Sequence, residues 1–321
     1  MERILKTLPI PVSGLVLALA STGNLVLSYG NIYRSFFGIL AGAGILLLIL
    51  KVIFMPQSVK EGFENPVIAS VLPTFSMALM ILSTYVKNIS STFGLGVWIL
   101  GLIIHIILIL LFTKKYILNF NIKRVFPSYF IVYVGIVCGS VTAPAFGINN
   151  LGQGIFWFGF TSYLLLLPVI VYRVFVIKEI PEPAIPTLTI FTAPASLCLA
   201  GYLNSFGEKN GMIIGFLGVI SFIMFTGVMV YIYKMLRLSF YPSYSAFTFP
   251  FVITAISMKG TNAYLMSMGR EVTILGYYVK FLEVWAVGIV LYVLFRYIHF
   301  ILTNLQSSSP ITTKRVVSDR G

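Results

Sequence analysis

Side chains that can do acid–base, nucleophilic or metal chemistry are few in this chain, and they do not cluster. Of the 321 residues 10% are charged, two are histidines and two are cysteines. Cys138 and Cys198 lie inside apolar segments, which favours small core residues over a disulfide or a metal site. No H-E-x-x-H, Walker-type or G-x-S-x-G motif occurs. The sequence therefore predicts no enzyme, no metal and no cofactor.

One apolar stretch is unusual because prolines interrupt it and aromatic side chains surround the interruption. Residues 241–258, YPSYSAFTFPFVITAISM, read as a membrane helix that Pro242 and Pro250 interrupt. Proline removes a backbone hydrogen bond, and in lipid the freed group must find a partner or line a polar cavity. Three aromatic side chains, Phe247, Phe249 and Phe251, surround the second proline, with no charged residue nearby. A broken, aromatic and uncharged helix favours a pathway with a plug over a catalytic site.

Composition indicates the elements that must hold this stretch. The chain is 58% hydrophobic with a mean hydropathy of +0.97, and a membrane-spanning helix needs about 20 mostly apolar residues. Ten segments qualify: roughly 8–28, 33–54, 67–87, 94–113, 128–148, 152–175, 186–206, 212–235, 244–265 and 272–302. We therefore expect an all-α polytopic membrane protein, with one membrane domain over residues 1–306 and a polar cytoplasmic tail over 307–321.

The net charge of +13 has a topological explanation. The charges lie in loops, not on one amphipathic face, which argues against nucleic acid as a partner. With the N-terminus in the cytoplasm, sixteen Lys and Arg fall on the cytoplasmic side and five on the other. The five are Arg34, Lys87, Lys209, Lys259 and Arg270. This asymmetry predicts that both termini are cytoplasmic and that the number of spans is even, in the inner or plasma membrane.

Prolines mark an internal repeat. They open or interrupt every odd-numbered segment, whereas the even-numbered segments contain one, Pro168. The steps between Pro11, Pro73, Pro127, Pro186 and Pro242 are 62, 54, 59 and 56 residues. The pairs FPSYF and YPSYS, and TAPAF and TAPAS, support a repeated unit, although membrane helices also tolerate proline without any repeat. We expect five helical hairpins in a ring, with odd segments facing the axis and Leu- and Ile-rich even segments facing lipid.

At these prolines the sequence resembles a known family. The LP at 72–73, PSY at 127–129, APA at 193–195 and AFTFPF at 246–251 are similar to the tellurite-resistance/dicarboxylate transporter family. That family includes bacterial TehA and the slow anion channels of plant guard cells, and the resemblance covers about residues 8–303. It implies ten helices in five hairpins with quasi-fivefold symmetry, a homotrimer with one pore per subunit, and a pore-blocking phenylalanine on the ninth helix.

The phenylalanine of the T-F-P run that resembles the family's gate is Phe249, with Phe247 and Phe251 as neighbouring candidates. The expected pore-helix kinks lie at Pro11, Pro73, Pro127, Pro194 and Pro250. Because the odd segments are nearly free of charge, positive potential is expected from N–H groups freed at the kinks, from helix dipoles and from the basic mouth.

Three of the titratable residues inside segments invite a specific interpretation. Lys280 and Glu283, three residues apart, are expected to form a structural ion pair. His105 lies on a segment assigned to the lipid-facing ring, where a structural role is favoured over proton transfer.

Two transport functions are compatible with these features. The first is an anion channel for small inorganic or organic anions through a neutral central pore that Phe249 closes. The alternative is a proton-coupled carrier of C4-dicarboxylates such as malate, or of tellurite oxyanions. A carrier needs titratable groups at its transport site, so the nearly uncharged odd segments favour the channel. A scaffold or receptor without transport is disfavoured, because the chain has no large soluble domain.

Overall fold

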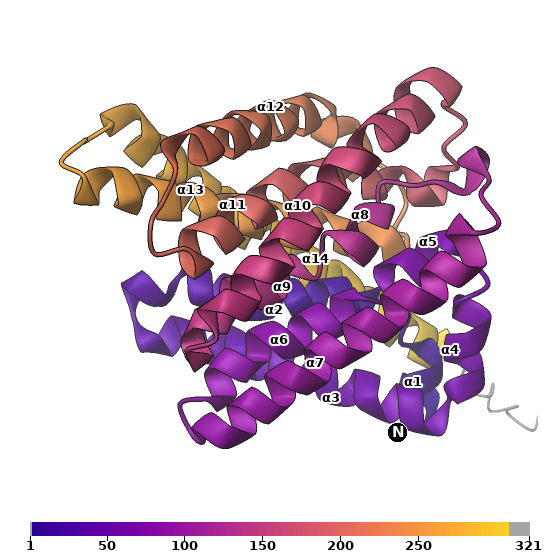
Figure 1. Ribbon diagram of the computed structural model, residues 1–321. Coiled ribbons are helices and arrows are strands. Elements are labelled where there is room, and N and C mark those ends of the chain that lie inside the picture. Colours follow the sequence, from indigo (N-terminus) through magenta and orange to yellow (C-terminus); the bar gives the residue numbers. More distant parts are fainter. Residues whose placement is uncertain (1, 308–321) are drawn as a thin grey trace, which may run out of the picture.

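Helices make up all the regular structure of the computed structural model, which describes residues 2–307 (Figure 1). No strand occurs within that range, which confirms the all-α prediction. Five long, continuous helices follow the even-numbered segments and are called the outer helices here. They are α3 (Asn31–Phe54), α7 (Ser91–Phe112), α10 (Asn149–Val171), α12 (Gly211–Leu236) and α14 (Thr273–Ser307).

The odd-numbered segments form five inner segments, four of which are interrupted. In order they are α2 (Val12–Leu25); α5 (Pro66–Val71) with α6 (Thr74–Val86); α8 (Tyr129–Tyr133) with α9 (Val137–Thr142) and η4 (Ala143–Phe146); η6 (Glu182–Thr192) with α11 (Ala193–Ser205); and η7 (Pro242–Phe247) with α13 (Phe249–Ser267). Short connecting elements are α1 (Glu2–Thr7), η1 (Leu27–Tyr29), α4 (Pro56–Gly62), η2 (Thr113–Ile117), η3 (Ile122–Arg124) and η5 (Tyr172–Ile177).

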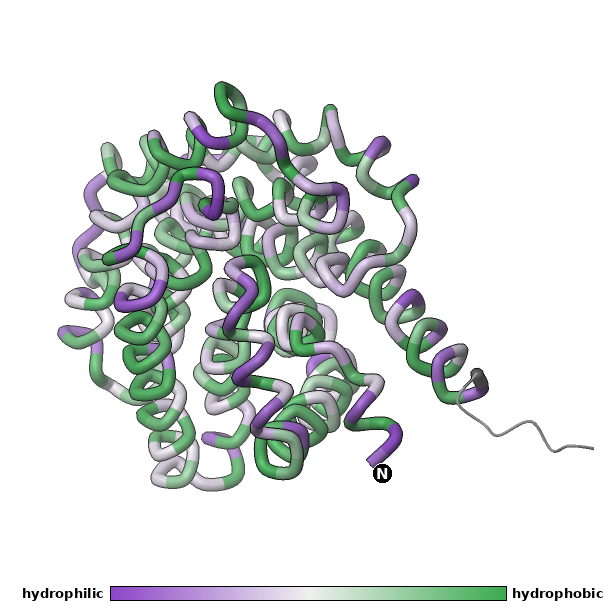
Figure 2. The backbone as a smooth tube through the Cα atoms, turned by 90° about the vertical axis from the view of Figure 1, so that its right-hand side faces the viewer, coloured by the Kyte–Doolittle hydropathy of each residue, from purple (hydrophilic) through white to green (hydrophobic). Residues whose placement is uncertain are grey.

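The inner segments close into a ring. Helix α2 packs on α6, α6 on α9, α9 on α11, α11 on α13, and α13 returns to α2. Each also packs on its outer helix, in the pairs α2 with α3, α6 with α7, α9 with α10, α11 with α12 and α13 with α14. Figure 2, which views the helices from the end that carries the N-terminus, shows hydrophobic outer helices around this ring. The predicted arrangement of five hairpins is present.

Burial separates the two layers. In the apolar stretches of α3, α7, α12 and α14 28% of residues are buried, against 72% for Pro66–Val86 and 89% for Glu182–Ser205. Large apolar side chains such as Ile39, Leu110 and Val230 are exposed on the outer helices. Such a continuous apolar surface is suited to lipid. The assignment of even segments to the outside and odd segments to the axis therefore agrees with the structure.

The number of membrane crossings is a separate question. Seven helices within residues 2–307 are long and apolar enough to cross a membrane by length and composition. The other three predicted segments contain α2, the short pieces from α8 to η4, and α13, which do not reach that criterion. The breaks and polar residues that shorten them belong to the axial layer. The count of ten spans stays a prediction, and residues 308–321 of the predicted tail lie outside the described range.

Proline stands at the start of four inner helices, and three of these helices follow a break. Pro11 and Pro73 are the residues before α2 and α6, and Pro194 and Pro250 lie in the first turns of α11 and α13. A proline in the first turn costs nothing in hydrogen bonds, because that N–H has no partner within the helix.

The third inner segment differs from the prediction. Its helix is interrupted between Tyr133 and Val137, whereas Pro127 lies two residues before α8 begins. The break contains Gly135, where an added Cβ would lie 2.7 Å from Met77 Sδ. Close packing against α6 at a glycine, and not Pro127, therefore accompanies the break in this segment.

Three N–H groups at the starts of inner helices have backbone partners. Gly14 N donates to Pro11 O at 3.0 Å, Val137 N to Val134 O at 3.0 Å, and Phe251 N to Thr248 O at 3.1 Å. These short-range bonds tighten the chain into 3₁₀-type turns and satisfy the donors. These three groups therefore differ from the freed N–H donors that the sequence led us to expect.

Candidate functional site: two chambers on the ring axis

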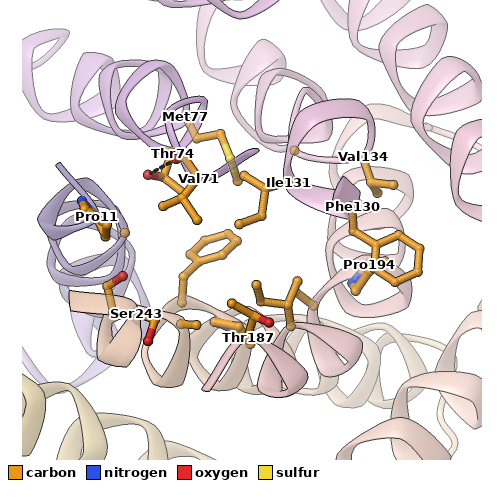
Figure 3. Close-up of a pocket in the computed structure, with 18 of the residues that line it drawn as sticks. Pro11, Val71, Thr74, Met77, Phe130, Ile131, Val134, Thr187, Pro194 and Ser243 are labelled. Atoms are coloured by element: carbon orange, nitrogen blue, oxygen red, sulfur yellow. Dashed lines mark hydrogen bonds between the residues drawn. The ribbon is translucent and has the colours of Figure 1, made fainter. Parts of the chain in front are cut away.

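Two cavities lie inside the ring, and residues of all five inner segments line each. The first chamber, near the starts of the inner segments, has a volume of about 50 Å³. In Figure 3 its labelled residues surround the cavity, with Pro11 and Ser243 across from Phe130 and Pro194. The second chamber, near the ends of the inner segments, has a volume of about 270 Å³. Leu197 lines both, so the chambers follow one another along the axis.

Phe249 lines the first chamber and is 6% exposed. Its two aromatic neighbours lie elsewhere: Phe247 packs on Tyr244 with 4.9 Å between ring centres, and Phe251 packs on Phe225 at 5.8 Å. Neither Phe247 nor Phe251 lines a chamber. The start of α13 therefore presents one phenylalanine, the predicted one, to the axis.

The first chamber is small, and large apolar side chains such as Phe249 form its wall. Its volume of about 50 Å³ is less than a fifth of the 270 Å³ of the second chamber. The lining is mostly apolar and includes Val71, Met77, Ile131 and Phe249. The first chamber is therefore the narrower and more apolar part of the passage in this conformation. The second chamber is large enough for an ion with several waters.

Fixed charge is absent from both linings. Among the described residues that line the chambers there is no Asp, Glu, Lys, Arg or His. The polar groups are hydroxyls and amides, including Thr74 and Thr187 in the first chamber and Asn24, Thr84 and Asn204 in the second. The sequence-based prediction of a neutral passage matches these two linings.

Most buried hydroxyls in the ring donate to backbone carbonyls one turn earlier. Thr142 Oγ1 donates to Cys138 O at 2.7 Å, Ser196 Oγ to Thr192 O at 2.7 Å, and Thr254 Oγ1 to Pro250 O at 2.8 Å. Serine and threonine hydroxyls inside helices commonly donate in this way. These hydroxyls therefore find their partners within their own helices.

The predicted ion pair has a different cation. Lys259 Nζ lies 2.6 Å from Glu283 Oε1, whereas Lys280 forms no ion pair within residues 2–307. Lys280 is exposed on α14, and Glu283 is buried against α13. Spacing along one helix identified a possible partner, but the packing of α13 on α14 brings Lys259 closer. Neither residue of the pair lines either chamber.

His105 is on an outer helix, as expected, but it does not face lipid. It is 0% exposed and points toward the ring, with Nδ1 2.8 Å from Ser76 Oγ and Nε2 3.1 Å from Val132 O. A carbonyl only accepts hydrogen bonds, so Nε2 carries the proton. Both ring nitrogens are satisfied by α6 and α8, which supports the predicted structural role.

A basic residue near the second chamber was not identified as a site residue from the sequence. Arg34, in the first turns of α3, donates from Nε to Asn24 Oδ1 at 3.0 Å and from Nη2 to Thr84 O at 3.2 Å. Asn24 and Thr84 both line the second chamber. Because Arg34 belongs to an even-numbered segment, counting charges along odd segments could not find it.

Comparisons with known proteins agree with this architecture. The profile of a family described as voltage-dependent anion channel, SLAC1, matches residues 8–302. Two uncharacterized transporters of the archaeon Methanocaldococcus jannaschii are each 26% identical, over 235 and 231 residues. These matches cover 64% and 63% of this chain, and 68% and 65% of the relatives. The predicted resemblance is thereby confirmed over nearly the whole ring, and the chain belongs to the voltage-dependent anion channel family, SLAC1, as an integral membrane protein with a role in anion transport.

Proposed function

We propose that this protein is a channel in which small anions pass along the ring axis through both chambers, and that Phe249 closes the passage. The observation that carries the proposal is the pair of axial cavities with uncharged linings. Conduction needs binding weak enough for the ion to leave, and a fixed cation in the passage would oppose release. The small volume of the first chamber, with Phe249 in its wall, supports a closed state.

In this proposal both termini lie in the cytoplasm of the cell membrane, as the loop charges favour, and three subunits each contain their own passage. Anions would collect at the basic cytoplasmic mouth. They would then cross the first chamber when the phenyl group of Phe249 moves aside, and reach the wider second chamber. The alternative of a proton-coupled dicarboxylate carrier is less well supported, because neither lining contains a carboxylate, an imidazole or an amine.

The test is chloride flux in proteoliposomes with Phe249→Ala beside wild type. Removing the benzyl group widens the first chamber, so the flux should rise at least about tenfold, which corresponds to about 1.4 kcal/mol of barrier height. Phe247→Ala is the matched control, because Phe247 is a buried phenylalanine of the same stretch that lines neither chamber. Equal flux from wild type and Phe249→Ala over a range of voltages would reject the gate.

A further inference from the structure

One buried hydroxyl of the ring lacks a hydrogen-bond partner and lines a chamber. Ser21, on α2, is 1% exposed, and its Oγ makes no hydrogen bond with any described residue. Hydroxyl groups elsewhere in the ring donate to a backbone carbonyl, as in Thr142 and Ser196. Ser21 lines the second chamber. A buried polar group without a partner is costly, so a site of this kind calls for a ligand or water.

A second free donor lies one turn away on the same face of α2. Asn24 also lines the second chamber, and its Oδ1 accepts from Arg34 Nε at 3.0 Å. A guanidinium has donors and no acceptor, so this bond fixes which end of the Asn24 amide faces Arg34. The amide nitrogen of Asn24 makes no hydrogen bond with a described residue. Arg34 thus holds Asn24 with its two N–H donors available.

The position of Arg34 is itself fixed from two sides. Its guanidinium carbon lies 4.2 Å from the centre of the Tyr85 ring, and Tyr85 OH donates to Ala20 O of α2 at 2.6 Å. Gly23 makes the approach possible, because a Cβ there would lie 2.3 Å from Tyr85 OH and 2.9 Å from Arg34 O. The glycine between Ser21 and Asn24 therefore allows α3 and α6 to pack tightly on this turn of α2.

The charge of Arg34 has no anionic partner. Within residues 2–307 Arg34 forms no ion pair, and its recorded acceptors are the neutral oxygens of Asn24 and Thr84. It is only partly exposed, so its field is screened less than that of a surface arginine. The second chamber thus combines unused hydrogen-bond donors with an uncompensated positive charge a few ångströms behind them, and this combination favours an anion over a cation or a neutral solute.

We infer that the second chamber contains a binding site for a small monovalent anion, such as a halide, nitrate or formate. Ser21 Oγ and Asn24 Nδ2 donate to the ion, and Arg34 positions Asn24 and supplies the attractive charge. With a volume of about 270 Å³, the chamber also holds several waters of the ion's hydration shell. Arg34 acts through Asn24 and not from the lining, which keeps the attraction moderate, as conduction requires. The inference rests on the proposed function for its use as a station in transport.

Bromide binding to the detergent-purified protein tests this site without any flux. The melting temperature is followed against bromide concentration at constant ionic strength, with gluconate as the balancing anion. Wild type should show a saturable rise. Ser21→Ala should raise the half-saturating bromide concentration about tenfold, the value of one hydrogen bond to a charged group, and Arg34→Gln should raise it by a similar factor.

Ser83→Ala is the matched control, since Ser83 is equally buried, donates to Met80 O at 2.6 Å and lines neither chamber. Its bromide curve should equal that of wild type. Folding of Ser21→Ala is not at risk, because the change removes an unsatisfied group. Crystals soaked in bromide should also show an anomalous difference peak between Ser21 and Asn24. A Ser21→Ala curve equal to that of wild type, or no peak at this place, overturns the inference.

The two proposals fail in different ways. Bromide binding is measured with Phe249 in place, so it does not depend on an open passage. A protein that conducts no anion, even as Phe249→Ala, but binds bromide through Ser21 would reject the channel and retain the site. If the protein conducts as proposed but its bromide affinity is unchanged by substitution of Ser21 or Arg34, the channel proposal stands and the binding site is rejected.

Discussion

Lys259 of α13 and Glu283 of α14 form an ion pair, with 2.6 Å between Lys259 Nζ and Glu283 Oε1. The second carboxylate oxygen accepts from Tyr29 OH at 2.6 Å, and this bond raises the pKa of the Tyr29 phenol. Lys259 Nζ also donates to Leu25 O at 3.0 Å. The pair therefore joins the fifth hairpin to the end of the first inner segment, where the ring closes.

Lys259→Met should destabilise the protein. It leaves the Glu283 carboxylate, whose side chain is 7% exposed, without its cation. Loss of one partner of a buried pair costs about 3–5 kcal/mol, and the partial exposure of Lys259 reduces the expectation to about 1–3 kcal/mol. Thermal unfolding in detergent should show a melting temperature lower by several degrees. Lys280→Met, at the exposed position that the sequence favoured, should leave it unchanged; the reverse order of effects would contradict the pairing.

Gly135→Ala should also destabilise the ring. The new Cβ would lie 2.2 Å from Ile131 O and 2.7 Å from Met77 Sδ, and the backbone carbonyl cannot move aside as a side chain can. Overpacking of this kind costs about 1–3 kcal/mol, measured again by thermal unfolding. Gly154→Ala on α10, where a Cβ meets nothing within 4 Å, should be neutral or stabilising by up to about 1 kcal/mol. Equal melting temperatures for the two variants would contradict the packing at the third break.

His105→Leu should lower stability and leave conduction intact. The substitution keeps most of the volume but removes the hydrogen bonds to Ser76 and to Val132 O, at a cost of about 1–3 kcal/mol for the buried carbonyl left unpaired. Made in the Phe249→Ala background, it should leave chloride flux per folded protein and its dependence on pH unchanged. If the flux depends on pH with His105 present and no longer does so in His105→Leu, the histidine would instead take part in proton transfer.

The sequence predicts the layers of this protein well and its lateral contacts poorly. The periodic prolines and the different composition of odd and even segments were enough to predict a ring of five hairpins, and the resemblance of the T-F-P run to the family's gate singled out Phe249, which lines the first chamber. Both signals are local in the chain. The pairing of Lys259 with Glu283 and of Arg34 with Asn24 joins different helices, and the facing residues depend on helix rotation, which one sequence does not specify. The same limit applies to His105. Its helix is apolar on all sides, so the sequence does not indicate which side faces the inner segments.

Flux through the Phe249→Ala variant should not follow a proton gradient. Neither chamber lining contains a carboxylate or an imidazole, and a proton-coupled carrier needs a titratable group whose protonation changes with the bound substrate. Chloride and malate uptake are therefore compared in liposomes with equal and unequal pH on the two sides, at a membrane potential clamped with potassium and valinomycin. The channel predicts that uptake depends on the anion gradient and the clamped potential, and that it is the same with and without the pH difference. Uptake of malate against its own gradient, driven by the pH difference, would establish the carrier and require a proton pathway outside the two chambers.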